Sequence, residues 1–145
     1  MRSLMLCAAL SVLLPTSAIA KVPAESEAAA NPAVDKLVGD FFEAIKAGKS
    51  QGAVHQALAN SPLMAGRDAD LQNLTAQVDN AIRIYGPILS VEKVSDAPLG
   101  TGYDKRYYLV RQEKMVTRWE FEFGRLKDGW AIVYFGFDDQ VRNWG

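Results

Sequence analysis

The sequence predicts an α+β fold in which helices from the N-terminal half pack on an antiparallel β-sheet from the C-terminal half. Residues 32–85 carry apolar residues at spacings of three and four, which is typical of amphipathic helices. Residues 102–138 hold most of the aromatic residues, and in WEFEF the apolar and acidic residues alternate, as they do in a strand with one buried face. Three consecutive antiparallel strands are therefore expected in this second region.

The first twenty residues predict a secretory signal peptide. Arg2 precedes an apolar run over 4–14, and the small residues Ala18-Ile19-Ala20 provide a cleavage site. The apolar run is much shorter than the roughly 20 residues that a membrane-spanning helix needs. We therefore expect a secreted protein, in the periplasm of a bacterium, that begins at Lys21 and has no membrane anchor. The single cysteine, Cys7, lies in the removed segment, so no disulfide is expected.

Charge and length limit the partners and the number of domains. Removal of residues 1–20 takes away Arg2, so 16 basic residues become 15 against 17 acidic ones, a net charge of about −2. This balance provides no basic surface for nucleic acid or an anionic membrane. About 125 residues remain (145 minus 20), enough for one domain but not for two. Residues 21–31 are predicted to be a flexible leader, and 32–145 a single domain.

The helix boundaries are predicted from capping residues, prolines and glycines. The first expected helix begins at Pro32 and is stopped by Gly48, the second spans about 50–60, and the third runs from Asp68 or Asp70 to Tyr85. A strand over 88–94 then leads into a loop over 95–102. Asn31 is the expected cap of the first helix, because Pro32 suits the first helical position. Ser50 is the expected cap of the second helix. Gly86-Pro87 ends the third.

Turn chemistry predicts how the three C-terminal strands pair. A three-residue loop at 127–129, closed by Gly129 in a left-handed conformation, and a tight turn at Glu113-Lys114 define the two hairpins. The expected cross-strand pairs are Leu126–Trp130, Phe123–Val133, Phe121–Phe135, Trp119–Phe137, Tyr108–Trp119, Arg106–Phe121 and Lys105–Glu122. This register places an aromatic stripe on the inner face. It turns five apolar residues to the outer face: Tyr107, Leu109, Trp130, Ile132 and Tyr134.

The order of these elements resembles the NTF2-like superfamily, which includes SnoaL-like and ketosteroid isomerase-like proteins. The likeness covers about residues 32–138 and rests on the FFEAIKAGK helix end, the long helix ending in YGP and the hairpin DGW-AIVYF. It implies a cone-shaped, cystatin-like domain whose curved sheet wraps the helices around a cavity, and whose outer sheet face pairs two subunits. By this resemblance, the ligand-binding residues are Phe41, Phe42, Tyr85, Arg106, Tyr108, Trp119 and Phe121.

No catalytic residue and no metal site are predicted. Enzymes of the superfamily place an Asp or His, often with a Tyr, inside the cavity, whereas here Glu120 and Glu122 fall on the outer face by the expected register. His55 is a lone histidine, which cannot form a common zinc site. Arg106 is the charged candidate inside: it could bind an anionic head group, or it could reach solvent. The aromatic stripe could likewise be core packing alone.

Three classes of function remain. The first is an exported, non-enzymatic domain that binds a small apolar or amphipathic ligand between sheet and helices, without a cofactor. The second is an interaction or assembly module of the cell envelope, a homodimer formed through the outer sheet face. The third is an isomerase, dehydratase or hydrolase of the same superfamily.

Overall fold

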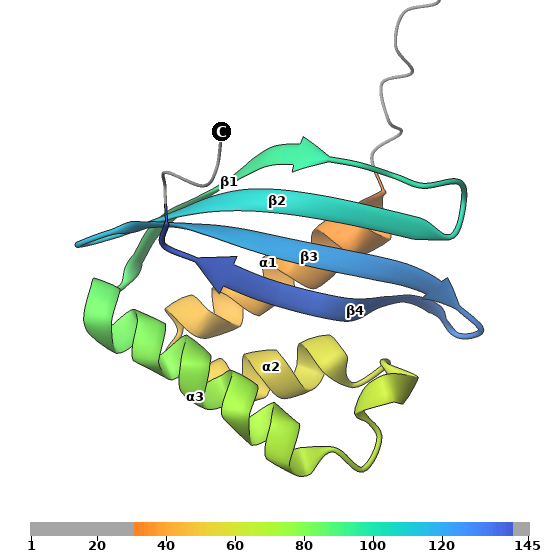
Figure 1. Cartoon of the computed structure of the whole chain (residues 1–145), viewed down its shortest axis with the longest axis horizontal. Coiled ribbons are helices and arrows are strands. Elements are labelled where there is room, and N and C mark those ends of the chain that lie inside the picture. Colours follow the sequence, from red (N-terminus) through yellow and green to blue (C-terminus); the bar gives the residue numbers. More distant parts are fainter. Residues whose placement is uncertain (1–30, 141–145) are drawn as a thin grey trace, which may run out of the picture.

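The computed structural model describes residues 31–140 and confirms the α+β class. In chain order its elements are α1 (Pro32–Lys46), α2 (Ser50–Leu58), the 3-10 helix η1 (Pro62–Met64), α3 (Asp68–Tyr85), β1 (Ile88–Asp96), β2 (Tyr103–Gln112), β3 (Val116–Leu126) and β4 (Gly129–Asp138). The strands form one antiparallel sheet in the order β1-β2-β3-β4, and the α-helices lie on one side of it (Figure 1). The predicted signal peptide and residues 21–30 of the predicted leader lie outside the described residues.

The helix ends follow the local sequence with one exception. Asn31 caps α1 by accepting a hydrogen bond from the Val34 backbone N–H, with Pro32 at the first helical position. The predicted capping role of Ser50 is wrong, because Lys49 is the cap of α2 and Ser50 is its buried first residue. The Lys49 N–H donates to the Ala44 carbonyl, so the chain leaves α1 and enters α2 within one tight turn. No helix within residues 31–140 is long and apolar enough to cross a bilayer.

The β2–β3 pairs agree with prediction, and the β3–β4 pairs agree only in part. Tyr108 lies opposite Trp119, Arg106 opposite Phe121 and Lys105 opposite Glu122. In the last hairpin Leu126 pairs with Gly129, so the loop has two residues and not three. The predicted pairs Phe123–Val133 and Leu126–Trp130 are therefore wrong. Phe123 pairs with Ile132, and a bulge at Val133 then restores the expected pairs Phe121–Phe135 and Trp119–Phe137.

The core lies between α1 and the inner face of the sheet. One stripe of α1 contributes Val34, Val38, Phe41, Phe42 and Ile45, and α2 adds Val54 and Leu58. The inner face contributes the alternate residues of β3, from Thr117 through Trp119 and Phe121 to Phe123. Apolar residues recur about every 3.6 residues along the helix and every 2 residues along the strands, so each element has one apolar face. The two apolar faces pack together, and their side chains are buried. The core thus fixes the position of α1 over β2 and β3.

Candidate functional site

The space in which the sequence predicted a ligand cavity is filled by aromatic rings. Trp119 and Phe121 are 1% and 0% exposed. The ring of Phe41 lies 5.8 Å from that of Trp119 and 5.4 Å from that of Phe121, in edge-to-face contacts. Phe42 makes the same kind of contact with Trp119, at 5.4 Å. These distances are the preferred ones for packed aromatic pairs, so the rings act as core here.

Arg106 is paired with carboxylates of its own chain. Its guanidinium, 2% exposed, donates to one oxygen of Asp104 at 2.9 and 3.1 Å and also bonds Asp35. Arg106, the charged candidate predicted inside, thus has a buried carboxylate beside it that was not predicted. Asp104 lies two residues away on β2 and so shares the inner face, while Asp35 comes from the first turn of α1. Burial alone would lower the pKa of Arg106, but hydrogen bonds with Asp104 and Tyr108 raise it above its usual value.

We call Asp35, Asp104, Arg106 and Tyr108 the Arg106 cluster. It joins the start of α1 to β2, and the second carboxylate oxygen of Asp104 is buried there without a hydrogen bond from any residue in 31–140. Burial raises the pKa of the Tyr108 phenol, and the hydrogen bond with Arg106 opposes this shift. A tyrosine hydroxyl is protonated at neutral pH and can donate a hydrogen bond. The cluster holds one positive and two negative side chains.

Tyr85 does not lie with the other predicted ligand-binding residues. It ends α3, and its hydroxyl donates to the carboxylate of Asp139, just beyond β4. This hydrogen bond raises the pKa of Tyr85, and partial burial adds to the effect. Tyr85 therefore anchors the end of the long helix to the end of the sheet.

A groove of about 310 Å³ runs between α1 and the β1–β2 side of the sheet, and we call it the inter-layer groove. Its lining residues are Asp35, Val38, Gly39, Phe42, Glu43, Lys46, Val91, Lys93 and Tyr108. The α1 residues recur at spacings of three and four, so they form one face of the helix. The wall is apolar and the rim carries both signs of charge, with Lys46 paired to Glu43 at 2.9 Å and Lys93 to Asp96 at 3.0 Å. Phe42 and Tyr108, two predicted ligand-binding residues, lie here.

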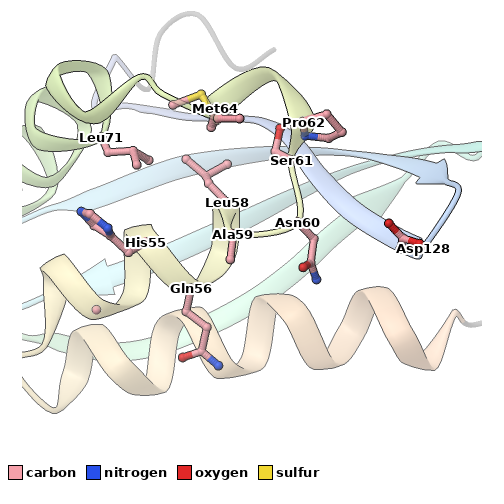
Figure 2. A pocket seen from close by; sticks show the side chains of 12 residues that line it. His55, Gln56, Leu58, Ala59, Asn60, Ser61, Pro62, Met64, Leu71 and Asp128 are labelled. Carbon is pink, nitrogen blue, oxygen red and sulfur yellow. The ribbon is translucent and has the colours of Figure 1, made fainter.

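A larger groove, of about 780 Å³, lies between α2, η1 and the β3–β4 turn, and we call it the helical groove (Figure 2). Its lining residues are Gly52, His55, Gln56, Leu58, Ala59, Asn60, Ser61, Pro62, Met64, Ala65, Leu71 and Asp128. Gly52, His55 and Gln56 lie on one face of α2, at spacings of three and four, and Ala59, which caps the C-terminus of the helix, continues that face. No lysine or arginine within residues 31–140 lines this groove.

The helical groove contains a serine, a histidine and an aspartate, but they are not arranged as a catalytic triad. Figure 2 shows Leu58 between His55 and Ser61, and Asp128 beyond Asn60 on the far side. The buried hydroxyl of Ser61 makes no hydrogen bond with any described residue, so no base activates it as a nucleophile. Residues 31–140 also contain no group of three or more His, Cys, Asp or Glu that could hold a metal ion.

The outer face of the sheet is more polar than predicted. Ile132 is 0% exposed and Trp130 packs against the core, because the bulge at Val133 turns both to the inner face; their predicted outward orientation is wrong. Tyr134 does face outward and is 50% exposed, and Tyr107 and Leu109 are half-buried on the same face. Lys105 bonds Glu120 and lies 3.4 Å from Glu122, and the cations of Lys105 and Arg118 lie 5.3 and 5.4 Å from the Tyr107 ring.

Comparison with known proteins bears on the fold. No protein-family model matches the sequence, and no curated protein does either. Among solved structures, the chain is similar to a crystal structure from Campylobacter jejuni that is provisionally assigned as an NTF2-like transpeptidase, with a TM-score of 0.52 and 14% identity. The match covers 71% of this chain and 97% of the other. The chain has the NTF2-like fold. At this identity the likeness extends to the NTF2-like architecture and not to activity.

Sequence reasoning missed Asp35, Asp104 and the two groove glycines, Gly39 and Gly52. The period-2 spacing of Asp104, Arg106 and Tyr108 was a readable signal that all three share the inner face. Gly39 and Gly52 sit inside helices, where glycine is unfavourable, and that departure from propensity was also visible in the sequence.

Proposed function

We propose that the protein is an exported, non-enzymatic NTF2-like domain that binds a small amphipathic ligand in the inter-layer groove. The groove has the composition of a small-molecule site, with apolar walls and a few polar groups that can orient a ligand. The apolar part of the ligand lies on Val91 and on the face of α1 at Gly39, and its polar end reaches the Tyr108 hydroxyl and the ammonium of Lys93.

The observation that carries this proposal is Gly39. A glycine inside a helix costs about 1 kcal/mol relative to alanine. A Cβ at this position would meet nothing within 4 Å, so packing does not require a glycine there. The absence of a side chain at Gly39 keeps the groove open. The glycine therefore serves the groove and is not required by contacts within the protein.

The other two functions have less support. Catalysis by a superfamily isomerase would need a free base, but the buried carboxylate, Asp104, is already paired with Arg106, and His55 lines the other groove. A transpeptidase, the activity in the name of the C. jejuni protein, needs an activated nucleophile, and the Ser61 hydroxyl has no hydrogen-bonding partner within residues 31–140. Assembly as a homodimer through the outer face would rest on Tyr107, Leu109 and Tyr134 alone. Weak self-association is expected, and sedimentation at tens of micromolar tests it.

The test of ligand binding uses the amphipathic dye 8-anilinonaphthalene-1-sulfonate. The folded wild type should bind the dye, and Gly39→Leu should weaken binding by roughly tenfold or more because the new side chain occupies the groove. Gly52→Leu is the matched control: it makes the same substitution on another helix and should leave the affinity unchanged. Thermal unfolding of each variant confirms that it is folded. Unchanged dye affinity in Gly39→Leu contradicts the proposal.

Export is tested separately. The protein recovered from the periplasm should have the intact mass of a chain that begins at Lys21. Retention of residues 1–20 would refute export by this signal.

A further inference from the structure

The helical groove shares with the inter-layer groove a glycine that the fold does not need. A Cβ at Gly52 would meet nothing within 4 Å, although the residue lies within α2. Gly52 sits one turn before His55 and Gln56 on the face that lines the groove. The helix therefore bears the cost of a glycine, and the result is an open wall along a groove of about 780 Å³.

The lining combines neutral hydrogen-bonding groups with an adaptable apolar surface. The amides of Gln56 and Asn60 can each donate and accept, which is what backbone N–H and C=O groups require of a partner. Met64 and Leu71, which are partly exposed, supply the apolar surface, and methionine adapts its shape to different side chains. Figure 2 shows Gln56 and Asn60 on the same side of Leu58, with Met64 on the other.

The charged groups that line the helical groove distinguish acidic peptides from neutral and basic ones. Asp128, at the β3–β4 turn, is the one carboxylate among the lining residues. The last turn of α2, which carries the partial negative charge of a helix C-terminus, forms one wall. No lysine or arginine of residues 31–140 lines the groove, so its lining favours a neutral or basic segment over an acidic one.

We propose that the helical groove binds an extended peptide segment, neutral or basic, with one apolar side chain. That side chain lies on Met64 and Leu71, the backbone pairs with the amides of Gln56 and Asn60, and a flanking lysine or arginine lies near Asp128. This is a second site, independent of the small-molecule site proposed between α1 and the sheet, so either proposal can fail without the other.

The test is selection from a displayed library of random heptapeptides against the full mature chain. Enriched sequences should contain an apolar residue flanked by neutral or basic ones. A labelled peptide from this selection, followed by fluorescence anisotropy, should bind Gly52→Leu at least roughly tenfold more weakly than the wild type. Gly39→Leu, the matched control in the other groove, should bind it equally well.

Two further variants test the same proposal, one by filling the groove at another position and one by removing its carboxylate. Ala59→Leu fills the same groove from the exposed residue that caps the C-terminus of α2, so it should weaken binding by a similar factor, and it replaces Gly52→Leu as the test variant if that variant does not fold. Asp128→Asn should weaken a lysine-containing peptide by a factor of about 2–5 and leave a neutral peptide unchanged. Failure to enrich any peptide, enrichment of acidic sequences, or equal affinity for both groove-filling variants and the wild type overturns the proposal.

Discussion

Lys105 and Arg106 are neighbours on β2 that point to opposite faces of the sheet, and each contacts two carboxylates. Arg106, on the inner face, pairs with Asp35 and Asp104 and has a side chain that is 2% exposed. Lys105, on the outer face, pairs with Glu120 and Glu122 and is 28% exposed. The number of ion pairs is the same, so any difference in their effect on stability comes from burial. Breaking a buried pair leaves an uncompensated charge away from water, whereas breaking a partly exposed pair does not.

The largest effect is expected from Arg106→Met, which removes the charge and keeps much of the side-chain volume. The free energy of unfolding should fall by about 3–5 kcal/mol, because Asp104 remains buried without a counter-charge. Urea unfolding followed by circular dichroism measures the loss. The hypothesis that Arg106 serves a ligand head group required little loss of stability, so this variant separates the two roles.

A double variant is the control for this prediction. In Asp104→Leu/Arg106→Met both buried charges are gone, so much of the lost stability should return, since apolar replacement of a buried pair is often neutral. If the single variant loses less than about 1 kcal/mol, the Arg106 cluster is not structural and the comparison between the two faces is wrong.

A smaller effect is expected from Lys105→Met on the outer face. The loss should be no more than about 1 kcal/mol, because water can solvate Glu120 and Glu122 once the lysine is gone. The same measurement at 0.5 M sodium chloride should show a still smaller difference between variant and wild type, since salt screens exposed charges. A loss as large as that of Arg106→Met would show that the outer network contributes as much as the buried one.

The smallest effect concerns pH and Tyr108 on the inner face. Its folded-state pKa is raised above the ordinary 10.0 by burial, so the native state holds the proton more tightly than the unfolded chain. Stability from this source is fully present below pH 10 and is lost as the pH rises through the folded-state pKa. Tyr108→Phe should flatten the decline of unfolding free energy between pH 9 and pH 11. An equally steep decline in the variant would assign the effect to other groups.

Much of the fold could be predicted because local signals determine it. The Asn31-Pro32 cap, the glycine after α3 and the tight turn before Val116 set the boundaries of their elements and the β2–β3 register. The β3–β4 register was predicted incorrectly near its turn. A two-residue loop with a bulge at Val133 and the predicted three-residue loop, with its bulge at Gly129, give the same pairs beyond Val133. The residues of the turn favoured the three-residue loop. The packing of Trp130 and Ile132 against the helices favours the two-residue loop with the bulge.

The candidate sites were harder to predict than the fold. The aromatic stripe was correctly placed on the inner face, but whether such rings surround a cavity or fill it depends on how closely α1 approaches the sheet, which no local pattern encodes. Asp35 lies 71 residues from Arg106 in the chain, and their ion pair exists only because the helix crosses β2 at that point. The grooves are spaces that side chains leave unfilled. In the sequence they are indicated by the glycines that line them, Gly39 and Gly52.

The bulge at Val133 also has a consequence for solubility. β4 is an edge strand, and an edge strand with unpaired N–H and C=O groups can add a strand from another molecule. A regular β4 would present Trp130, Ile132 and Tyr134 together on the uncovered face beside that edge, an aggregation-prone combination. The extra residue interrupts the flat edge and places Trp130 and Ile132 beneath the sheet. One inserted residue is thus expected to protect the edge strand against pairing with other molecules, and no charged side chain is needed for this.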